Sequence, residues 1–172
     1  MLEFILGFAL LWGVLYLVAT TYGWHKIWVH AFGPADMGPV QFEELTKGPR
    51  PNQALVCPKG VCLDKDRDIV SPVYALSALQ LRDVLLNALQ KEDGLERVDD
   101  GSDPLALRFV ARTRRLQFPD TVRVRFYNLT DDSATIAIYS QSQIGRSDFG
   151  VNLARVRRWL KRLKEFEKTE ET

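Results

Sequence analysis

Histidine and cysteine are scarce in this 172-residue chain, which holds two of each. Both histidines, His25 and His30, precede residue 31, so the rest of the chain lacks the base of the usual Ser–His and Cys–His catalytic arrangements. The acidic residues show no paired spacing that indicates acid–base catalysis. We therefore expect a protein that is not an enzyme and has no catalytic residues.

Metal ligands are also few. The spacing of five between the two histidines does not place both imidazoles on one helical face. The charged run Asp64-Lys65-Asp66-Arg67-Asp68 resembles the start of a calcium loop, but Ile69 and Ala75 stand where such a loop needs a glycine and a bidentate glutamate. We expect no metal site and no cofactor.

Charged residues are absent from residues 4–22, FILGFALLWGVLYLVATTY. At about 1.5 Å per residue a helix of this length spans about 28 Å, close to the ~30 Å hydrocarbon core of a bilayer. No basic residue precedes the run, and residues 18–22 are a poor cleavage site, which favours an uncleaved membrane anchor over a secretory signal peptide. The aromatic residues expected to contact the bilayer or its headgroup layer are Phe4, Trp12, Tyr16, Tyr22, Trp24 and Trp28.

Two signals oppose each other on which side of the membrane the remaining chain lies. Lys26 is the one basic residue close to the apolar run, which under the positive-inside rule favours a cytoplasmic location. Cys57 and Cys62 enclose a proline and a glycine, so a tight loop closed by a disulfide is feasible and favours an oxidising compartment. A metal pair lacks further ligands nearby, and two buried free thiols are the other alternative. We predict a disulfide and a single-pass protein of the inner membrane with a periplasmic soluble domain.

Prolines concentrate in one part of the chain, since five of the eight lie between Gly33 and Gly60. We interpret this part as an extended tether, whose residues 33–55 would reach roughly 70 Å when fully drawn out. The predicted organisation is a membrane anchor with an interfacial segment over residues 1–32, a tether over 33–56, a soluble domain over 57–168 and a tail over 169–172.

Hydrophobic periodicity in the soluble domain predicts an α+β fold. A helix is expected to begin at Ser71-Pro72 and to end at about Lys91, because serine is a good N-cap and proline suits the first turn. A short strand over residues 95–98 and alternating runs over 105–111, 122–127 and 134–139 predict an antiparallel meander of about four strands. A last helix over about 153–168 completes the pair of flanking helices that should cover the sheet.

Charge is divided unevenly along the chain. Residues 1–103 hold 9 basic and 14 acidic residues, whereas residues 104–172 hold 14 basic and 8 acidic ones. Arginines alternate with apolar residues in the expected strands, which predicts a basic, solvated sheet face formed by Arg108, Arg112, Arg114, Arg123 and Arg125. Such a face is a candidate site for anionic lipid or an acidic ligand. Arginine stems that merely cover the sheet are the alternative.

Phe118-Pro119-Asp120 and the run YSQSQIGRSDFGVN over residues 139–152 resemble the signature of domain-of-unknown-function family 1499. The resemblance covers about residues 50–165, including the turn between the two cysteines, and implies a bacterial domain behind a signal or membrane anchor with no established activity. The matching motif positions are Gly145, Arg146, Asp148, Gly150, Asn152 and Arg155. Gln141 and Gln143 depart from the family pattern, which carries arginines there.

Two interpretations of the motif positions follow. In the structural one, Gly145 and Gly150 permit a tight turn from strand into helix, Asp148 or Asn152 caps the helix, and Arg146 pairs with Asp148. In the functional one, the helix N-terminus and Arg146 hold a phosphate or carboxylate.

Docking onto a membrane protein complex, as an accessory or structural subunit, is the function that the sequence favours. A single anchor, an interfacial aromatic cluster and a compact charge-polarised domain all suit such a role. The alternative is a periplasmic binding module for an anionic ligand or lipid headgroup that uses the arginine-rich sheet face. No nucleic-acid recognition motif is present, so we expect the membrane and a membrane protein complex as partners and no nucleic acid.

Overall fold

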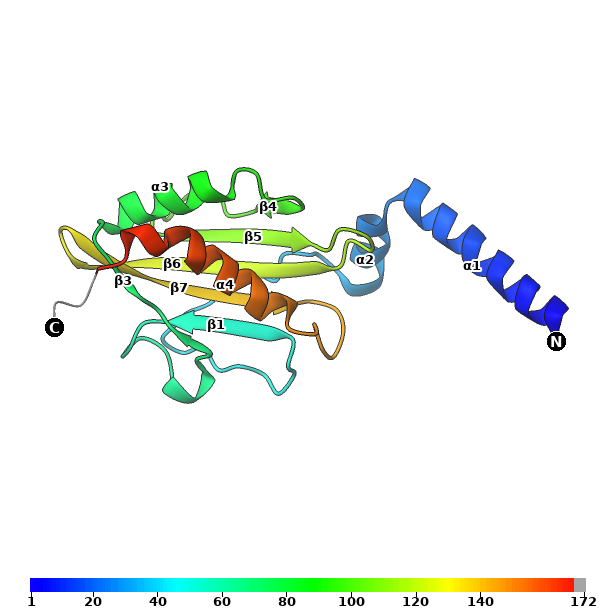
Figure 1. The fold of residues 1–172 in the computed structure, drawn as a ribbon, viewed down its shortest axis with the longest axis horizontal. Coiled ribbons are helices and arrows are strands. Elements are labelled where there is room, and N and C mark those ends of the chain that lie inside the picture. The colour runs from blue at the N-terminus through cyan, green and yellow to red at the C-terminus, as the bar shows by residue number, and fades with distance from the viewer. Residues whose placement is uncertain (169–172) are drawn as a thin grey trace.

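The computed structural model describes residues 1–168, apart from the side chains of Leu2 and Asp64. Its first element is helix α1 (Leu2–Tyr22), which projects away from the rest of the molecule (Figure 1). Among the residues of α1 whose side chains are described, Ala19 is the one that is buried. Residues 3–22 are long and apolar enough to cross a membrane, a property that a signal sequence shares. A second, shorter helix, α2 (Trp24–Phe32), follows after Gly23.

The remaining residues form one mixed sheet and two covering helices, which we call the head. The seven strands are β1 (Gln53–Cys57), β2 (Ile69–Val70), β3 (Val73–Tyr74), β4 (Leu95–Arg97), β5 (Ala106–Arg112), β6 (Pro119–Thr130) and β7 (Ser133–Ser142). The helices are α3 (Ala78–Leu89) and α4 (Val151–Leu163), with short 3₁₀ turns η1 (Asp64–Asp66) and η2 (Lys164–Phe166). The α+β class is confirmed.

The sheet is larger than the expected meander of about four strands. Its order is β2-β1-β7-β6-β5-β4, and β3 also pairs with β7. All pairings are antiparallel except that of β1 with β2. The long central strands β5, β6 and β7 are those with clear alternation in the sequence. The missed strands are short and lie between prolines and turns, where periodicity carries little signal.

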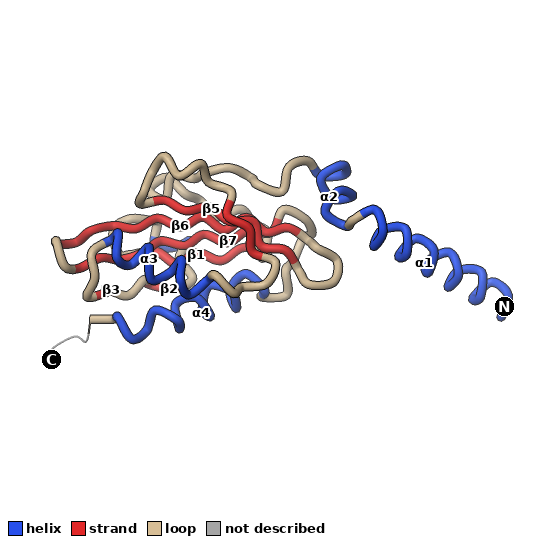
Figure 2. Tube along the Cα trace, turned by 90° about the horizontal axis from the view of Figure 1, so that it is seen from above, coloured by secondary structure: helices blue, strands red, loops and turns tan. Residues whose placement is uncertain are grey.

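Two layers cover the sheet. Helices α3 and α4 lie on one face and bury the main core, whose largest side chains include Trp159, Tyr74 and Phe126. The chain between α2 and β1 runs over the opposite face, as Figure 2 shows from above. There Phe42 packs with Leu55 and Tyr139 in a second, smaller core. We call residues 34–45 the strap.

The strap differs from the extended tether that the sequence suggested for residues 33–56. Gln53–Cys57 form strand β1, which lies between β2 and β7 in the sheet, and the Ala35 and Phe42 side chains are buried. The physical reason is the apolar run Ala54-Leu55-Val56, which pairs with β7 and β2 and is wholly buried. Prolines on either side of this run do not interrupt its backbone hydrogen bonds.

Helix α3 begins six residues later than the sequence suggested. Ser77 is its N-cap and forms a capping box with Gln80. Ser71 and Pro72 instead join β2 to β3: the Ser71 N–H donates to the Cys57 carbonyl, and Thr135 Oγ1 donates to the Pro72 carbonyl. Pairing with the sheet therefore overrides the local helix-start signal.

Candidate functional site

The motif residues meet in a buried polar cluster where β7 turns into α4. At its centre, Arg155 Nη2 lies 2.6 Å from Asp120 Oδ2 on β6, and both side chains are less than a tenth exposed. Arg155 Nη1 donates to Ser140 Oγ at 2.9 Å and to Asn152 Oδ1 at 2.8 Å. The arginine thus links α4 to two strands of the sheet.

Asn152 extends the cluster to the start of β1. Its Nδ2 lies 2.9 Å from Ser142 Oγ, 3.1 Å from the Asn52 carbonyl and 2.7 Å from Asp148 Oδ2. Asn52 in turn donates to the Gly145 carbonyl at 3.0 Å. Every member is bonded to another member, so the cluster fastens β1, β6, β7 and α4 together.

Asp148 caps α4, as the structural interpretation of the motif expected. Its carboxylate accepts hydrogen bonds from the backbone N–H groups of Gly150 at 3.0 Å and Asn152 at 2.7 Å. Gly150 adopts φ 81°, a left-handed conformation that glycine takes without steric cost. The positive end of the helix is therefore already occupied by a carboxylate of the chain itself.

Arg146 lies apart from this cluster. Its side chain is exposed, and in the described structure it forms no ion pair with Asp148 or with another carboxylate. The six motif positions thus divide between five that build the turn and its fastening and one that faces solvent. Asn52, Asp120, Ser140 and Ser142 complete the cluster, and sequence reasoning missed their roles because their partners lie on other elements of the fold.

Four of the five arginines predicted for the sheet face have partners within the chain, which differs from the solvated face that the sequence suggested. Arg108 Nε lies 2.8 Å from Asp36 of the strap, and Arg125 Nη1 lies 2.6 Å from Asp103. Arg112 Nη2 lies 3.9 Å from Glu96 Oε2. Arg114, in contrast, is exposed on the turn after β5. The strap and the loop before β5 therefore neutralise much of this face.

Arg123 is the most buried of these arginines, at 5 % exposed. Its Nε donates to the Gly38 carbonyl at 2.8 Å and its Nη1 to Gln141 Oε1 at 3.1 Å, and the guanidinium lies over the Tyr139 ring. No carboxylate pairs with it among residues 1–168. Burial lowers the pKa of the Arg123 guanidinium despite the nearby Asp36 carboxylate.

The two glutamines that replace family arginines both contact this covered face. Gln141 accepts the bond from Arg123, and Gln143 Nε2 donates to the Pro34 carbonyl at 2.6 Å. Neutral amides at these positions suit a sheet face on which the strap lies, because a second buried guanidinium beside Arg123 would be repelled.

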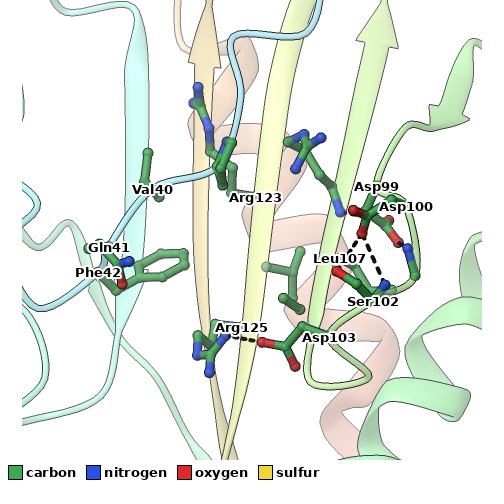
Figure 3. A pocket seen from close by; sticks show the side chains of 15 residues that line it. Val40, Gln41, Phe42, Asp99, Asp100, Ser102, Asp103, Leu107, Arg123 and Arg125 are labelled. Carbon is green, nitrogen blue, oxygen red and sulfur yellow. Dashed lines mark hydrogen bonds and ion pairs between the residues drawn. The ribbon is translucent and has the colours of Figure 1, made fainter.

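A cavity of about 260 Å³ lies between the strap and the loop before β5 (Figure 3). Asp99, Asp100 and Asp103 line one side, and Phe42 lines the other. Asp103 faces Arg125, and Asp100 accepts hydrogen bonds from Ser102. The pKa of Asp99 is lowered: burial raises it, but Arg97 and the backbone N–H of Arg108 outweigh that effect. These carboxylates are ionised and already engaged, which does not suit a general acid.

The aromatic residues after the apolar helix join it to the head. Trp28 Nε1 donates to the Leu116 carbonyl at 2.6 Å, and its ring centroid lies 4.8 Å from that of Phe118. Trp24 stacks on Trp28 at 5.7 Å and lies 6.0 Å from Tyr16. Three of the six predicted aromatics, Tyr16, Trp24 and Trp28, thus form a continuous row from α1 to the β5–β6 hairpin.

The outer aromatic positions and the cysteines complete the predicted site residues. Phe4, Trp12 and Tyr22 are exposed on α1. Cys57 and Cys62 form the predicted disulfide, with their Cα atoms 6.1 Å apart, and its presence is typical of an oxidising compartment. Among the residues that the structure describes, no group of three histidine, cysteine or acidic side chains is arranged to hold a metal ion.

Comparison with known proteins agrees with the motif. No curated protein matches the sequence. The family model for DUF1499, a protein of unknown function, matches residues 42–163, which span β1 to α4 and include the whole buried cluster. The chain therefore belongs to the DUF1499 family.

Proposed function

We propose that this protein is a single-pass, membrane-anchored, non-catalytic subunit whose head docks onto a membrane protein complex. In this proposal α1 is retained as the anchor and the head lies outside the cytoplasm, beside the inner membrane. The observation that carries the proposal is the contact of Trp28 with Leu116 and Phe118, because it fixes the head against the anchor. A head fixed in this way presents its far end at a constant height above the bilayer.

The end of the head farthest from α1 carries exposed aliphatic side chains. Val70, Val73, Leu79 and Leu129, which we call the distal patch, are each between 39 % and 52 % exposed. Leu129 lies at the end of β6, which is opposite to α1 in Figure 1. Val70, Val73 and Leu129 line one hollow together with Pro58 and Pro72, and the charged residues Lys59, Glu167 and Lys168 border it. Apolar side chains gathered around a hollow are typical of protein interaction surfaces.

We propose a non-catalytic role because the cysteines and the cavity carboxylates of the head are not free to act as catalytic groups. The cysteines are joined in a disulfide, and no histidine lies beyond residue 30. The carboxylates that line the cavity beside the strap face arginine or hydroxyl partners. These groups are engaged in holding loops, so none is free to act as nucleophile or base.

Purification of the full-length chain from native membranes in mild detergent tests the proposal. We expect a stoichiometric membrane protein partner that is lost with Leu129→Arg, because a charge in the distal patch opposes burial. Leu63→Arg is the matched control, since Leu63 is 44 % exposed but lies outside the patch. A chain that purifies alone, or a partner that both variants retain, contradicts docking through this surface.

The alternative function, an anionic-ligand module on the sheet face, has one observation in its favour. Arg123 is buried without a carboxylate partner, and its Nη2 makes no hydrogen bond within residues 1–168. An anion could reach it only beside the strap, whose Gly38 carbonyl already accepts from this arginine. Thermal stabilisation of the full chain by inorganic phosphate, abolished by Arg123→Met, would favour this alternative.

A further inference from the structure

Four arginines lie at the end of the head nearest the anchor and lack carboxylate partners. Arg50, Arg114, Arg115 and Arg146, which we call the proximal arginines, are all exposed. None of them forms an ion pair with a residue that the structure describes. This end therefore carries four uncompensated positive charges.

Contacts with α2 and the residues after it show that these arginines lie at the end of the head next to the anchor. Arg114 and Arg115 belong to the β5–β6 hairpin, whose Leu116 and Phe118 contact Trp28. Arg146 belongs to the loop between β7 and α4, where Gln143 donates to the Pro34 carbonyl just after α2. In Figure 1 that loop lies at the end of the head from which α1 projects.

Two of the proximal arginines border a single open hollow. Arg50 and Arg146 line it together with Pro49, Pro51 and Gly145, and its volume is about 690 Å³. The residues between the two arginines are uncharged, so the hollow has positive charge on its rim and no acidic group in its lining. A phosphate group would find complementary charge there.

Phe149 adds an apolar element beside these charges. Its side chain is 96 % exposed, more than any other large hydrophobic side chain that the structure describes apart from Met1. Its backbone has φ 52°, a left-handed conformation that is unfavourable for a residue with a Cβ atom. Val151, two residues on, is 42 % exposed. An exposed aromatic ring next to arginines is typical of segments that enter the headgroup–acyl boundary of a membrane.

We propose that this end of the head lies on the anionic headgroup layer of the membrane that holds α1. The proximal arginines bind lipid phosphates, and Phe149 enters the interface between headgroups and acyl chains. The proposal rests on the proposed function only in requiring that α1 is retained. In this proposal the anionic lipid contacts the proximal arginines and not the arginines of the sheet face, which the strap covers. Lipid is favoured over an acidic protein because a retained α1 places the anionic membrane surface beside the proximal arginines, whose charge is complementary to it.

The test uses the full chain reconstituted in phosphatidylcholine vesicles with and without phosphatidylglycerol. An environment-sensitive fluorophore is attached at Ser147→Cys, beside Phe149, and in a second preparation at Asp131→Cys on the β6–β7 hairpin. We expect quenching by spin-labelled lipid at position 147 that rises when phosphatidylglycerol is present and falls at high salt. Position 131 should show little quenching in either vesicle.

Variants separate the proximal arginines from basic charge in general. Replacing Arg114 and Arg115 by glutamine should weaken the contact by about fivefold for each arginine removed. Arg157→Gln with Lys161→Gln, two exposed positions on α4, is the matched control and should leave the quenching unchanged. Melting temperatures of all variants should stay close to that of the parent, because exposed unpaired charges contribute little to stability.

Three results would overturn the proposal: equal quenching at positions 147 and 131, no response to phosphatidylglycerol, or an equal loss in the α4 control. Shielding of position 147 that appears only in native membranes would identify an acidic protein as the occupant and overturn the lipid contact. Flotation with neutral vesicles tests the anchor separately. A chain that floats but shows no lipid response contradicts this inference alone, whereas a chain that fails to float contradicts the proposed function.

Discussion

Arginines in the interior of the head and arginines at its proximal end differ in how their charge is compensated. Arg155 and Arg108 each face a carboxylate within hydrogen-bond distance, and Arg123 is held by carbonyl and amide oxygens. Arg114 and Arg146 have no such partners among the described residues and are exposed. The compensated arginines fasten elements of the fold together. The uncompensated ones are left to interact with something outside the chain.

Removing the partner of a compensated arginine should produce the largest effect. Asp120→Ala leaves Arg155 buried with an unpaired charge, and we expect a loss of about 3–5 kcal/mol in the free energy of unfolding. Urea denaturation in detergent, followed by near-ultraviolet circular dichroism, measures it. Arg158→Ala is the control, since its side chain is 51 % exposed and its pair with Glu92 should contribute no more than about 1 kcal/mol.

A comparable loss of unfolding free energy in Asp120→Ala and Arg158→Ala would show that a buried arginine pair contributes no more to stability than an exposed one. The double variant Asp120→Leu with Arg155→Met sharpens the test. It removes both charges and should recover much of the lost stability, because no unpaired charge stays buried.

Release of the strap should have an intermediate effect. Asp36→Ala removes the partner of Arg108 and the acceptor of the Gly38 N–H, and should destabilise the chain by about 1–2 kcal/mol. Hydrogen exchange should rise at Met37, whose N–H donates to Thr121 Oγ1. The exposed Glu44→Ala is the control. Unchanged exchange in Asp36→Ala would mean that the strap does not depend on this pair.

The exposed ring at the proximal end should be replaceable with a small gain in stability. Phe149→Asn relieves the left-handed strain and should raise the unfolding free energy in detergent by up to about 1 kcal/mol. The same variant should lose quenching at position 147 in phosphatidylglycerol vesicles. Val151→Asn, at a helical position, lacks the strain and should show no gain. A stability loss in Phe149→Asn would indicate that the ring packs on the head itself.

Acid should weaken the loop before β5. Because the pKa of Asp99 is lowered in the folded state, the unfolded chain binds more protons as the pH falls below the ordinary aspartate value. Stability from this group is complete above that value and is lost as the pH falls through the folded pKa. Asp99→Asn should therefore make the acid dependence of the melting temperature shallower, and an identical slope in both proteins would contradict the assignment.

The sequence predicted features that depend on neighbouring residues. The apolar run of α1, the disulfide, the strands β5, β6 and β7 and the last helix follow from length, spacing and alternation. The sequence narrowed the cap of α4 to Asp148 or Asn152, and the structure shows that Asp148 accepts from Gly150 and Asn152, which lie within four residues of it. Local chemistry decides all of these features.

Features that depend on distant partners could not be predicted. Asp36 lies 72 residues before Arg108, and Asn52 lies 100 residues before Asn152, so neither contact leaves a periodic signal. The prolines of the strap predict a tether, whereas its course is fixed by contacts with the sheet face, such as those of Phe42 and of the Gly38 carbonyl. Local preference was also overridden at Ser71-Pro72, where pairing with β7 prevents a helix.

The central claim is that α1 stays attached and holds the head at the membrane. Intact mass measurement of the protein recovered from alkaline-washed native membranes tests it most directly. We expect a mass that includes residues 4–22 in the membrane pellet. A mature chain that begins after Thr21, or that appears in the aqueous wash, would contradict the account.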